Sequence, residues 1–153
     1  MMKKITLSLI TILIASAAAF AQIENPVKWS YSAKKISDKV YEVYMTATLD
    51  PKWHIYAQDA GEEAQSTSIS FSKNPLISLE GKVKEQGTLI KEYDKNIGSV
   101  LKFYANKITF VQKVKLRSNV ATVLKGSVAY IVCNDRKCLP PKDVPFSIKL
   151  EGK

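Results

Sequence analysis

The sequence is poor in the residues that carry most catalytic and metal chemistry. Its 153 residues include two cysteines and one histidine, His54. So few cysteines exclude a disulfide-rich miniprotein. Two thiolates leave a zinc site two ligands short, and the sequence offers no nucleophile–histidine–acid set and no glycine-rich phosphate loop. We therefore expect no cofactor, and a metal site is the weakest hypothesis.

Long apolar runs are absent after residue 21. The one such run, residues 5–18, follows Lys3 and Lys4 and precedes the small-x-small pattern Ala19-Phe20-Ala21. Its 14 residues are short for a membrane span, which needs about 20. This pattern predicts a signal peptide over residues 1–21, cleaved near Ala21/Gln22, and one exported soluble domain over residues 22–153. No cysteine lies near the cleavage point, so the sequence gives no sign of a lipid anchor.

Arginine is scarce although the chain is basic, with 23 basic and 14 acidic residues and a net charge of +9. All the basic residues except Arg117 and Arg136 are lysines, spaced along the whole chain. A nucleic-acid site needs clustered charge beside stacking groups. We therefore expect no nucleic-acid partner and interpret the lysines as a solvated surface.

Alternation of apolar and polar residues dominates what is present. It covers residues 27–34, 41–49, 108–116 and 144–150, and Gln112 interrupts the third stretch. This period of two predicts strands with one face on a core and one in water. Shorter candidates are residues 53–56, 67–72, 76–79, 82–86 and 100–104, with breakers at Gly81 and Ala105-Asn106 among others.

Seven to nine strands without an amphipathic helix predict an all-β, antiparallel sandwich. An immunoglobulin-like topology fits best, although periodicity alone does not separate it from a jelly roll or a small barrel. The polar stretches 58–68 and 92–99 are predicted to be long loops, with at most one helical turn over residues 59–65.

The two cysteines, Cys133 and Cys138, flank Asn134-Asp135-Arg136-Lys137 between two β-prone segments, 120–132 and 144–150. This spacing predicts a hairpin with facing cysteines, whose Cα atoms would lie about 4.5–5.5 Å apart. Such a distance permits a disulfide, and export provides an oxidising compartment.

The residues alone leave open whether this bond is a structural staple or a redox pair. A staple across so short a loop contributes only about 2 kcal/mol. Arg136 and Lys137 precede Cys138 and favour its thiolate, whereas Asp135 opposes it.

The cysteine segment resembles the N-terminal periplasmic domain of the bacterial thiol:disulfide interchange protein DsbD. The resemblance rests on Val128-Ala129-Tyr130-Ile131-Val132-Cys133, on Cys138-Leu139-Pro140-Pro141, and on the following Val144-Pro145-Phe146. Upstream, Trp53-His54-Ile55-Tyr56 is similar to the family's aromatic strand, and residues 94–98 with 100–104 look like its cap loop. Most of residues 24–151 can be laid on the family, but only the cysteine hairpin is specific.

The resemblance implies an immunoglobulin-like sandwich with an inserted cap loop and a disulfide that cycles in electron transfer. Cys138 would exchange with partners and Cys133 would resolve. Tyr56 would pack near the pair, Asp94 would belong to the cap, and Ile97 would take the place of the family's shielding aromatic. Thioredoxin-like or disulfide-isomerase-like partners, a periplasmic location and a monomer are expected.

The sequence departs from the family in three respects. Its cysteine loop is one residue shorter than in well-known members, Ile97 replaces an aromatic residue, and the membrane-embedded and thioredoxin-like domains are missing. We therefore expect a membrane electron donor that acts in trans. Two alternatives remain: a binding or adhesion module with a structural disulfide for the protein, and a buried or rim histidine with a structural hydrogen bond for His54.

Overall fold

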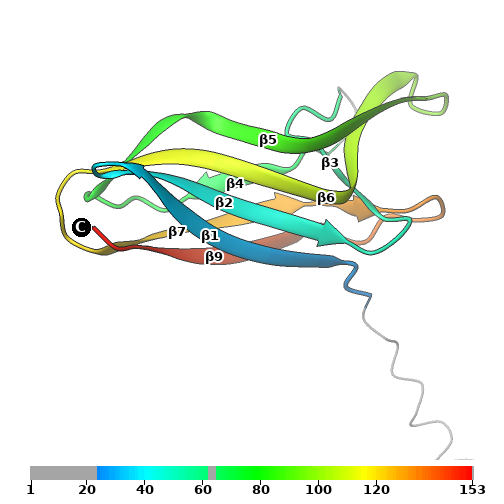
Figure 1. The fold of residues 1–153 in the computed structure, drawn as a ribbon. Coiled ribbons are helices and arrows are strands. Elements are labelled where there is room, and N and C mark those ends of the chain that lie inside the picture. The colour runs from blue at the N-terminus through cyan, green and yellow to red at the C-terminus, as the bar shows by residue number, and fades with distance from the viewer. Residues whose placement is uncertain (1–23, 62–64, 153) are drawn as a thin grey trace, which may run out of the picture.

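The computed structural model describes residues 24–61 and 65–152. The predicted signal peptide, residues 1–21, lies outside this part of the chain. Within it, nine strands form two antiparallel sheets that lie face to face (Figure 1). The predicted immunoglobulin-like sandwich is thus confirmed. No helix among the described residues is long and apolar enough to cross a membrane.

The larger sheet is built around one long strand, β6, which is paired on both edges. Its order is β1 (Val27–Ser37), β2 (Val40–Leu49), β6 (Ser99–Leu116), β3 (His54–Tyr56) and β8 (Val132–Cys133), and β5 (Ile77–Asp94) also pairs with β6. The smaller sheet has the order β4 (Ser68–Phe71), β7 (Thr122–Tyr130) and β9 (Lys142–Leu150). Strands β2 and β3 pair one after the other with the same edge of β6. Strand β6 therefore connects the sandwich to the part of the molecule that holds the cysteines.

The hydrophobic core lies between the two sheets, where the alternating positions of the sequence meet. Strand β2 shows the rule, since its alternate residues from Tyr41 to Leu49 are buried and those between them are more exposed. Phe110, Met45 and Ile108 are fully buried. Full burial of a side chain of this size contributes about 1.5–3 kcal/mol, so these residues stabilise the sandwich.

Two predicted strand breaks are wrong. Gly81 does not end a strand, because β5 continues through it with a register shift between Glu80 and Lys84. Asn106 adopts a left-handed φ of 64° within the continuous strand β6. A bulge lets a strand bend and then resume its pairing, so breaker residues here shape long strands instead of ending them.

The predicted loop over residues 92–99 is also wrong. Strands β5 and β6 pair from Leu89–Tyr104 to Asp94–Ser99, so only residues 95–98 form a turn. We call residues 89–104 the cap hairpin. By contrast, the described part of the other polar stretch, residues 58–61 and 65–67, is neither helix nor strand, and the predicted helical turn lies partly outside the described residues.

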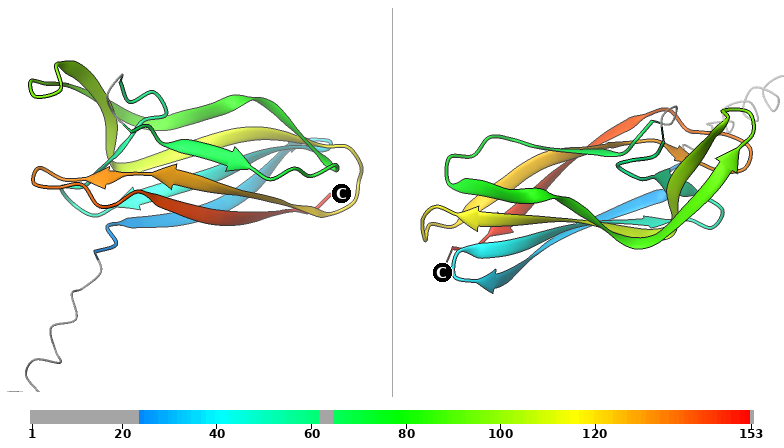
Figure 2. Two further views of the ribbon diagram at one scale, coloured as in Figure 1. Left: turned by 180° about the vertical axis from the view of Figure 1, so that it is seen from behind. Right: turned by 90° about the horizontal axis from the view of Figure 1, so that it is seen from above.

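The apolar run 120–132 forms two strands instead of one, because the chain changes sheets at Ile131. Tyr130 pairs with Lys142 in the smaller sheet, whereas Val132 pairs with Ile55 in the larger one. The cysteine segment therefore leaves the β7–β9 pair and joins β3. This crossing brings the cysteine segment, orange in Figure 2, to the same end of the sandwich as the cap hairpin.

Candidate functional site

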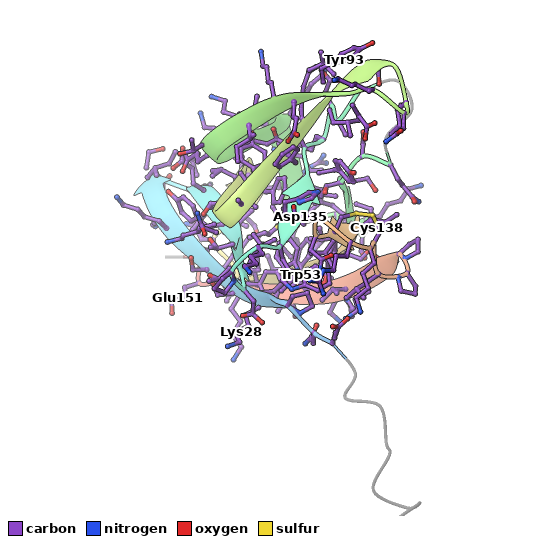
Figure 3. All side chains as sticks on the ribbon, turned by 90° about the vertical axis from the view of Figure 1, so that its right-hand side faces the viewer. Lys28, Trp53, Tyr93, Asp135, Cys138 and Glu151 are labelled. Carbon is purple, nitrogen blue, oxygen red and sulfur yellow. A yellow bond between two sulfur atoms is a disulfide. The ribbon has the colours of Figure 1, made fainter. Side chains whose placement is uncertain are left out.

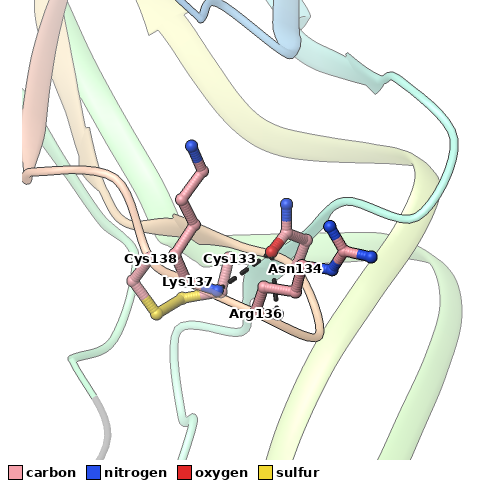
Figure 4. Close-up of a disulfide and its surroundings, with 5 residues drawn as sticks. All are labelled: Cys133, Asn134, Arg136, Lys137 and Cys138. Atoms are coloured by element: carbon pink, nitrogen blue, oxygen red, sulfur yellow. Dashed lines mark hydrogen bonds between the residues drawn. A yellow bond between two sulfur atoms is a disulfide. The ribbon is translucent and has the colours of Figure 1, made fainter.

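A disulfide joins Cys133 and Cys138 across a minimal hairpin, residues 132–139, which we call the cysteine hairpin (Figure 4). The Cα atoms lie 4.0 Å apart, closer than the predicted 4.5–5.5 Å. The flanking backbone bonds run from Asn134 N to Lys137 O and from Leu139 N to Val132 O. The cysteines therefore form a non-hydrogen-bonded pair, which is the closer of the two kinds in antiparallel strands.

Asn134 shapes the turn of this hairpin. Its Oδ1 accepts hydrogen bonds from the backbone nitrogens of Arg136, at 2.9 Å, and Lys137, at 3.0 Å. An Asn side chain that mimics a backbone acceptor in this way stabilises a tight turn. The turn is thus held by hydrogen bonds that do not depend on the sulfur–sulfur bond.

The two sulfur-bearing residues differ sharply in exposure. Cys133 is 2% exposed because its strand, β8, extends the larger sheet beside β3. Cys138 is exposed, since it lies beyond the strand and is paired only with Cys133. One end of the disulfide therefore faces solvent and the other is enclosed.

An open pocket of about 920 Å³ lies between the cysteine hairpin and the cap hairpin. Five of the predicted site residues line it, namely Cys133, Cys138, His54, Tyr56 and Asp94. Figure 3 looks into this end of the molecule, with Tyr93 of the cap hairpin on one side and Cys138 and Asp135 on the other. The structure thus brings together residues from three separate parts of the chain.

Strand register explains the floor of the pocket. His54 pairs with Cys133 on one side and with Ala105 on the other, and Tyr56 pairs with Phe103. Directly paired residues point to the same face of a sheet, so all five side chains point toward the pocket. The rings of His54 and Phe103 are 4.5 Å apart, and those of His54 and Tyr56 are 5.7 Å apart.

Burial dominates the electrostatics of this floor. It lowers the pKa of His54, while the nearby carboxylates of Asp135 and Glu92 raise it to a smaller extent. Burial also raises the pKa of Tyr56, and the charge of Asp94 adds to this. A neutral imidazole and a neutral phenol therefore lie beside the disulfide near neutral pH.

Asp94 lines the pocket and also shapes the tip of the cap hairpin. Its Oδ1 accepts hydrogen bonds from the backbone nitrogens of Asn96, at 2.7 Å, and Ile97, at 3.2 Å. Its carbonyl accepts one from Gly98 N at 2.8 Å, where a φ of 75° favours glycine. Asp94 thus positions the turn in the way that Asn134 does in the cysteine hairpin.

Three predicted site residues lie outside the lining of the pocket. Ile97 is 41% exposed in the turn of the cap hairpin. Lys137 forms an ion pair with Glu24, with Nζ 2.6 Å from Oε2. The charged ends of Arg136 and Lys137 extend away from the sulfur–sulfur bond (Figure 4).

Sequence reasoning did not single out several other lining residues, among them Glu92, Tyr93 and Phe103. Phe103 lies within a predicted strand, but only the register with Tyr56 shows that it faces the cysteines. Tyr93 carries a clearer signal in the sequence, because it is an aromatic residue within the polar stretch 92–99. The structure leaves it 60% exposed.

Sulfur exchange is the chemistry that these residues offer. The described residues hold no group of three or more His, Cys, Asp or Glu side chains placed to bind a metal ion. What the pocket holds is a solvent-accessible sulfur bonded to an enclosed one, with an imidazole in the next strand. Attack by a thiolate on Cys138 would open this bond.

No protein-family model and no curated protein sequence matches this chain. Solved structures match its fold. The N-terminal periplasmic domain of ScsB from Proteus mirabilis superposes with a TM-score of 0.59 at 18% identity, over 84% of this chain. The chain spans 47% of that ScsB structure, less than half its length.

Two structures from Neisseria meningitidis match as well. The DsbD N-terminal domain in its reduced form has a TM-score of 0.55 at 16% identity, over 89% of this chain and 94% of that one. The complex between the DsbD and PilB N-terminal domains has a TM-score of 0.53 at 14% identity, covering 84% and 87%. The chain therefore has the fold of the N-terminal periplasmic domains of DsbD and ScsB, at low sequence identity.

Proposed function

We propose that this protein carries electrons between partner proteins by thiol–disulfide exchange at Cys133 and Cys138. The observation that carries the proposal is the unequal exposure of the two cysteines at the edge of an open pocket. A bond whose only task is to staple a hairpin needs no accessible sulfur. A carrier needs one sulfur that a partner can reach and one that waits behind it.

The exposures support a different role for each cysteine. In the reduced protein, the Cys138 thiolate attacks a sulfur of the partner's disulfide and forms a mixed disulfide. Cys133 then attacks the Cys138 sulfur, closes the internal bond and releases the partner as a dithiol. Cys133 is 2% exposed, so a protein-sized partner has no direct route to it.

The cap hairpin lies on the other side of the pocket, and we propose that it limits the directions from which Cys138 can be approached. We propose that a thioredoxin-like or disulfide-isomerase-like partner enters beside it, with a membrane protein as electron donor. The structure of a DsbD N-terminal domain in complex with a PilB domain supports partner binding by this fold. A periplasmic location is supported by the predicted signal peptide and by the disulfide, which persists in oxidising compartments.

Trapping of mixed disulfides tests the assignment of roles. Cys133→Ala leaves Cys138 able to attack but removes the residue that releases the partner, so we expect covalent adducts on a non-reducing gel. Cys138→Ala is the matched control, because it keeps one cysteine in the same hairpin but leaves only the enclosed one. Adducts with C138A and none with C133A would reverse the roles.

The reduction potential separates this proposal from a binding module with a structural disulfide. Structural disulfides in secreted proteins lie below about −300 mV. We expect the Cys133–Cys138 bond to lie well above that value, measured by equilibration with glutathione or thioredoxin couples. A value below it, with no trapped partner, would leave a binding module.

A further inference from the structure

The enclosed position of Cys133 poses a chemical problem for the second half of the exchange. A thiol attacks a disulfide as its thiolate. Cys138 reaches water and can lose its proton there, whereas Cys133 is 2% exposed. Burial in apolar surroundings keeps a thiol protonated, so the resolving step needs a proton acceptor beside Cys133.

His54 lies where such an acceptor is needed. It is the directly paired residue of Cys133 on the neighbouring strand β3, and such pairs place their Cβ atoms about 4.5–5.5 Å apart on one face of a sheet. Its ring packs on Phe103 and edge-on to Tyr56.

We propose that His54 is the general base of the resolving step and takes the proton of Cys133 as that sulfur attacks Cys138. This inference rests on the proposed function and deepens it by naming a catalytic residue. It also separates the two cysteines chemically, since Cys138 reacts without a base and Cys133 reacts with one.

The step is balanced in atoms and electrons. The imidazole of His54 accepts the Cys133 proton, and the Cys133 sulfur forms a bond to the Cys138 sulfur. The bond between Cys138 and the partner breaks, and its electron pair leaves on the partner's thiolate. The two cysteines are oxidised, the partner's disulfide has been reduced, and the imidazolium passes its proton to water. In the reverse direction the imidazolium protonates Cys133 as it leaves.

Burial keeps His54 suited to this task despite the charged groups around it. Titratable groups line the pocket on three sides. Lys52 lies just before β3 and Tyr56 lies in it, and Asp135 lies in the cysteine hairpin. The cap hairpin contributes Glu92, Tyr93, Asp94 and Lys95. Burial outweighs the carboxylates and lowers the pKa of His54 from its usual 6.5. The imidazole is therefore neutral near pH 7 and loses its basic form as the pH falls through its lowered pKa.

A two-phase reaction with a chromogenic disulfide tests the proposal. The reduced protein is mixed with one equivalent of dithiobis-nitrobenzoate in a stopped-flow instrument. The first thiolate released reports attack by Cys138, and the second reports closure by Cys133. In H54Q we expect the second phase to slow by about tenfold or more near pH 7, since general bases contribute about 10²-fold or more, and the first phase to change less than about twofold.

The pH profile distinguishes a base from a packing residue. His54 is the only histidine, so a wild-type inflection below pH 6.5 that H54Q lacks belongs to it. C133A should abolish the second phase, which identifies that phase as closure by Cys133. In H54A the site should fold but lack its base, so added imidazole should restore the second phase.

An unchanged second phase and pH profile in H54Q would overturn the role of His54. So would an equal slowing of both phases that imidazole does not relieve. A wild-type protein that releases no thiolate at all would instead overturn the proposed function itself, and the inference with it.

Discussion

Reduction of the disulfide should cost this domain little stability, and the size of the loss can be worked out from the hairpin. The cysteines are separated by five positions, so the bond closes a loop of six residues. The chain-entropy relation gives such a loop about 2 kcal/mol. Two backbone hydrogen bonds and the Asn134 side chain already hold the turn, so this figure is an upper value. Cys133 can remain buried as a thiol, because a free cysteine packs as a small apolar residue.

Urea unfolding of the oxidised and the reduced protein measures this loss. Circular dichroism is the appropriate signal, because Trp53 lines the pocket and its fluorescence would respond to the sulfurs themselves. We expect the free energy of unfolding to fall by about 2 kcal/mol or less, with an unchanged dependence on urea. C133A/C138A should match the reduced protein apart from about 1 kcal/mol for the buried Cys133 sulfur that alanine lacks.

A loss of about 4 kcal/mol or more, which corresponds to a loop near 100 residues, would refute the reasoning. It would mean that the bond organises much more than its own turn. Unfolding on reduction would have the same meaning, since a carrier must stay folded in both redox states.

Two further predictions concern the frame that supports the site. Gly126→Ala should destabilise the protein by about 1–3 kcal/mol through overpacking, because the added Cβ would lie 2.2 Å from the Ser70 carbonyl oxygen and 2.5 Å from Phe146 Cζ; a thermal unfolding temperature equal to that of the wild type would contradict this. Tyr104→Phe should cost about 1.5–3 kcal/mol, because the Tyr104 hydroxyl donates to Glu85 Oε2 at 2.8 Å. Faster amide hydrogen exchange at the base of the cap hairpin would accompany that loss, and unchanged exchange would argue against it.

The fold could be predicted from the sequence wherever strands alternate. Strand β2 buries its odd-numbered positions from Tyr41 to Leu49 as its pattern indicates. The prediction failed at Gly81 and Asn106, where local preferences indicate a break. Both positions have φ above 60°, and the pairing of β5 with β6 continues past them. A residue that favours a break acts within its own strand. Pairing with the neighbouring strand can still continue past it, and the sequence around the residue does not show this.

The site could be predicted less completely, because it depends on pairings between distant strands. Cys133 and Cys138 define their own hairpin by their spacing alone. The position of His54 beside Cys133, and of Phe103 beside Tyr56, depends on which strands become neighbours. The change of sheet at Ile131 decides the pairing of His54 with Cys133, and no local pattern marks that change, since residues 120–132 form one apolar run.

That change of sheet also accounts for the unequal exposure on which the proposed function depends. Had the chain continued along β7 into an ordinary β7–β9 hairpin, the two cysteines would have faced each other at its tip with similar exposure. Because Val132 and Cys133 instead join β3, the larger sheet covers the first sulfur and leaves the second at its edge. The order of the two chemical steps would then follow from the topology, since the enclosed cysteine can react only after a partner has bonded to the exposed one. Its proton must also leave within the protein, which makes a neighbouring imidazole useful at Cys133 and unnecessary at Cys138.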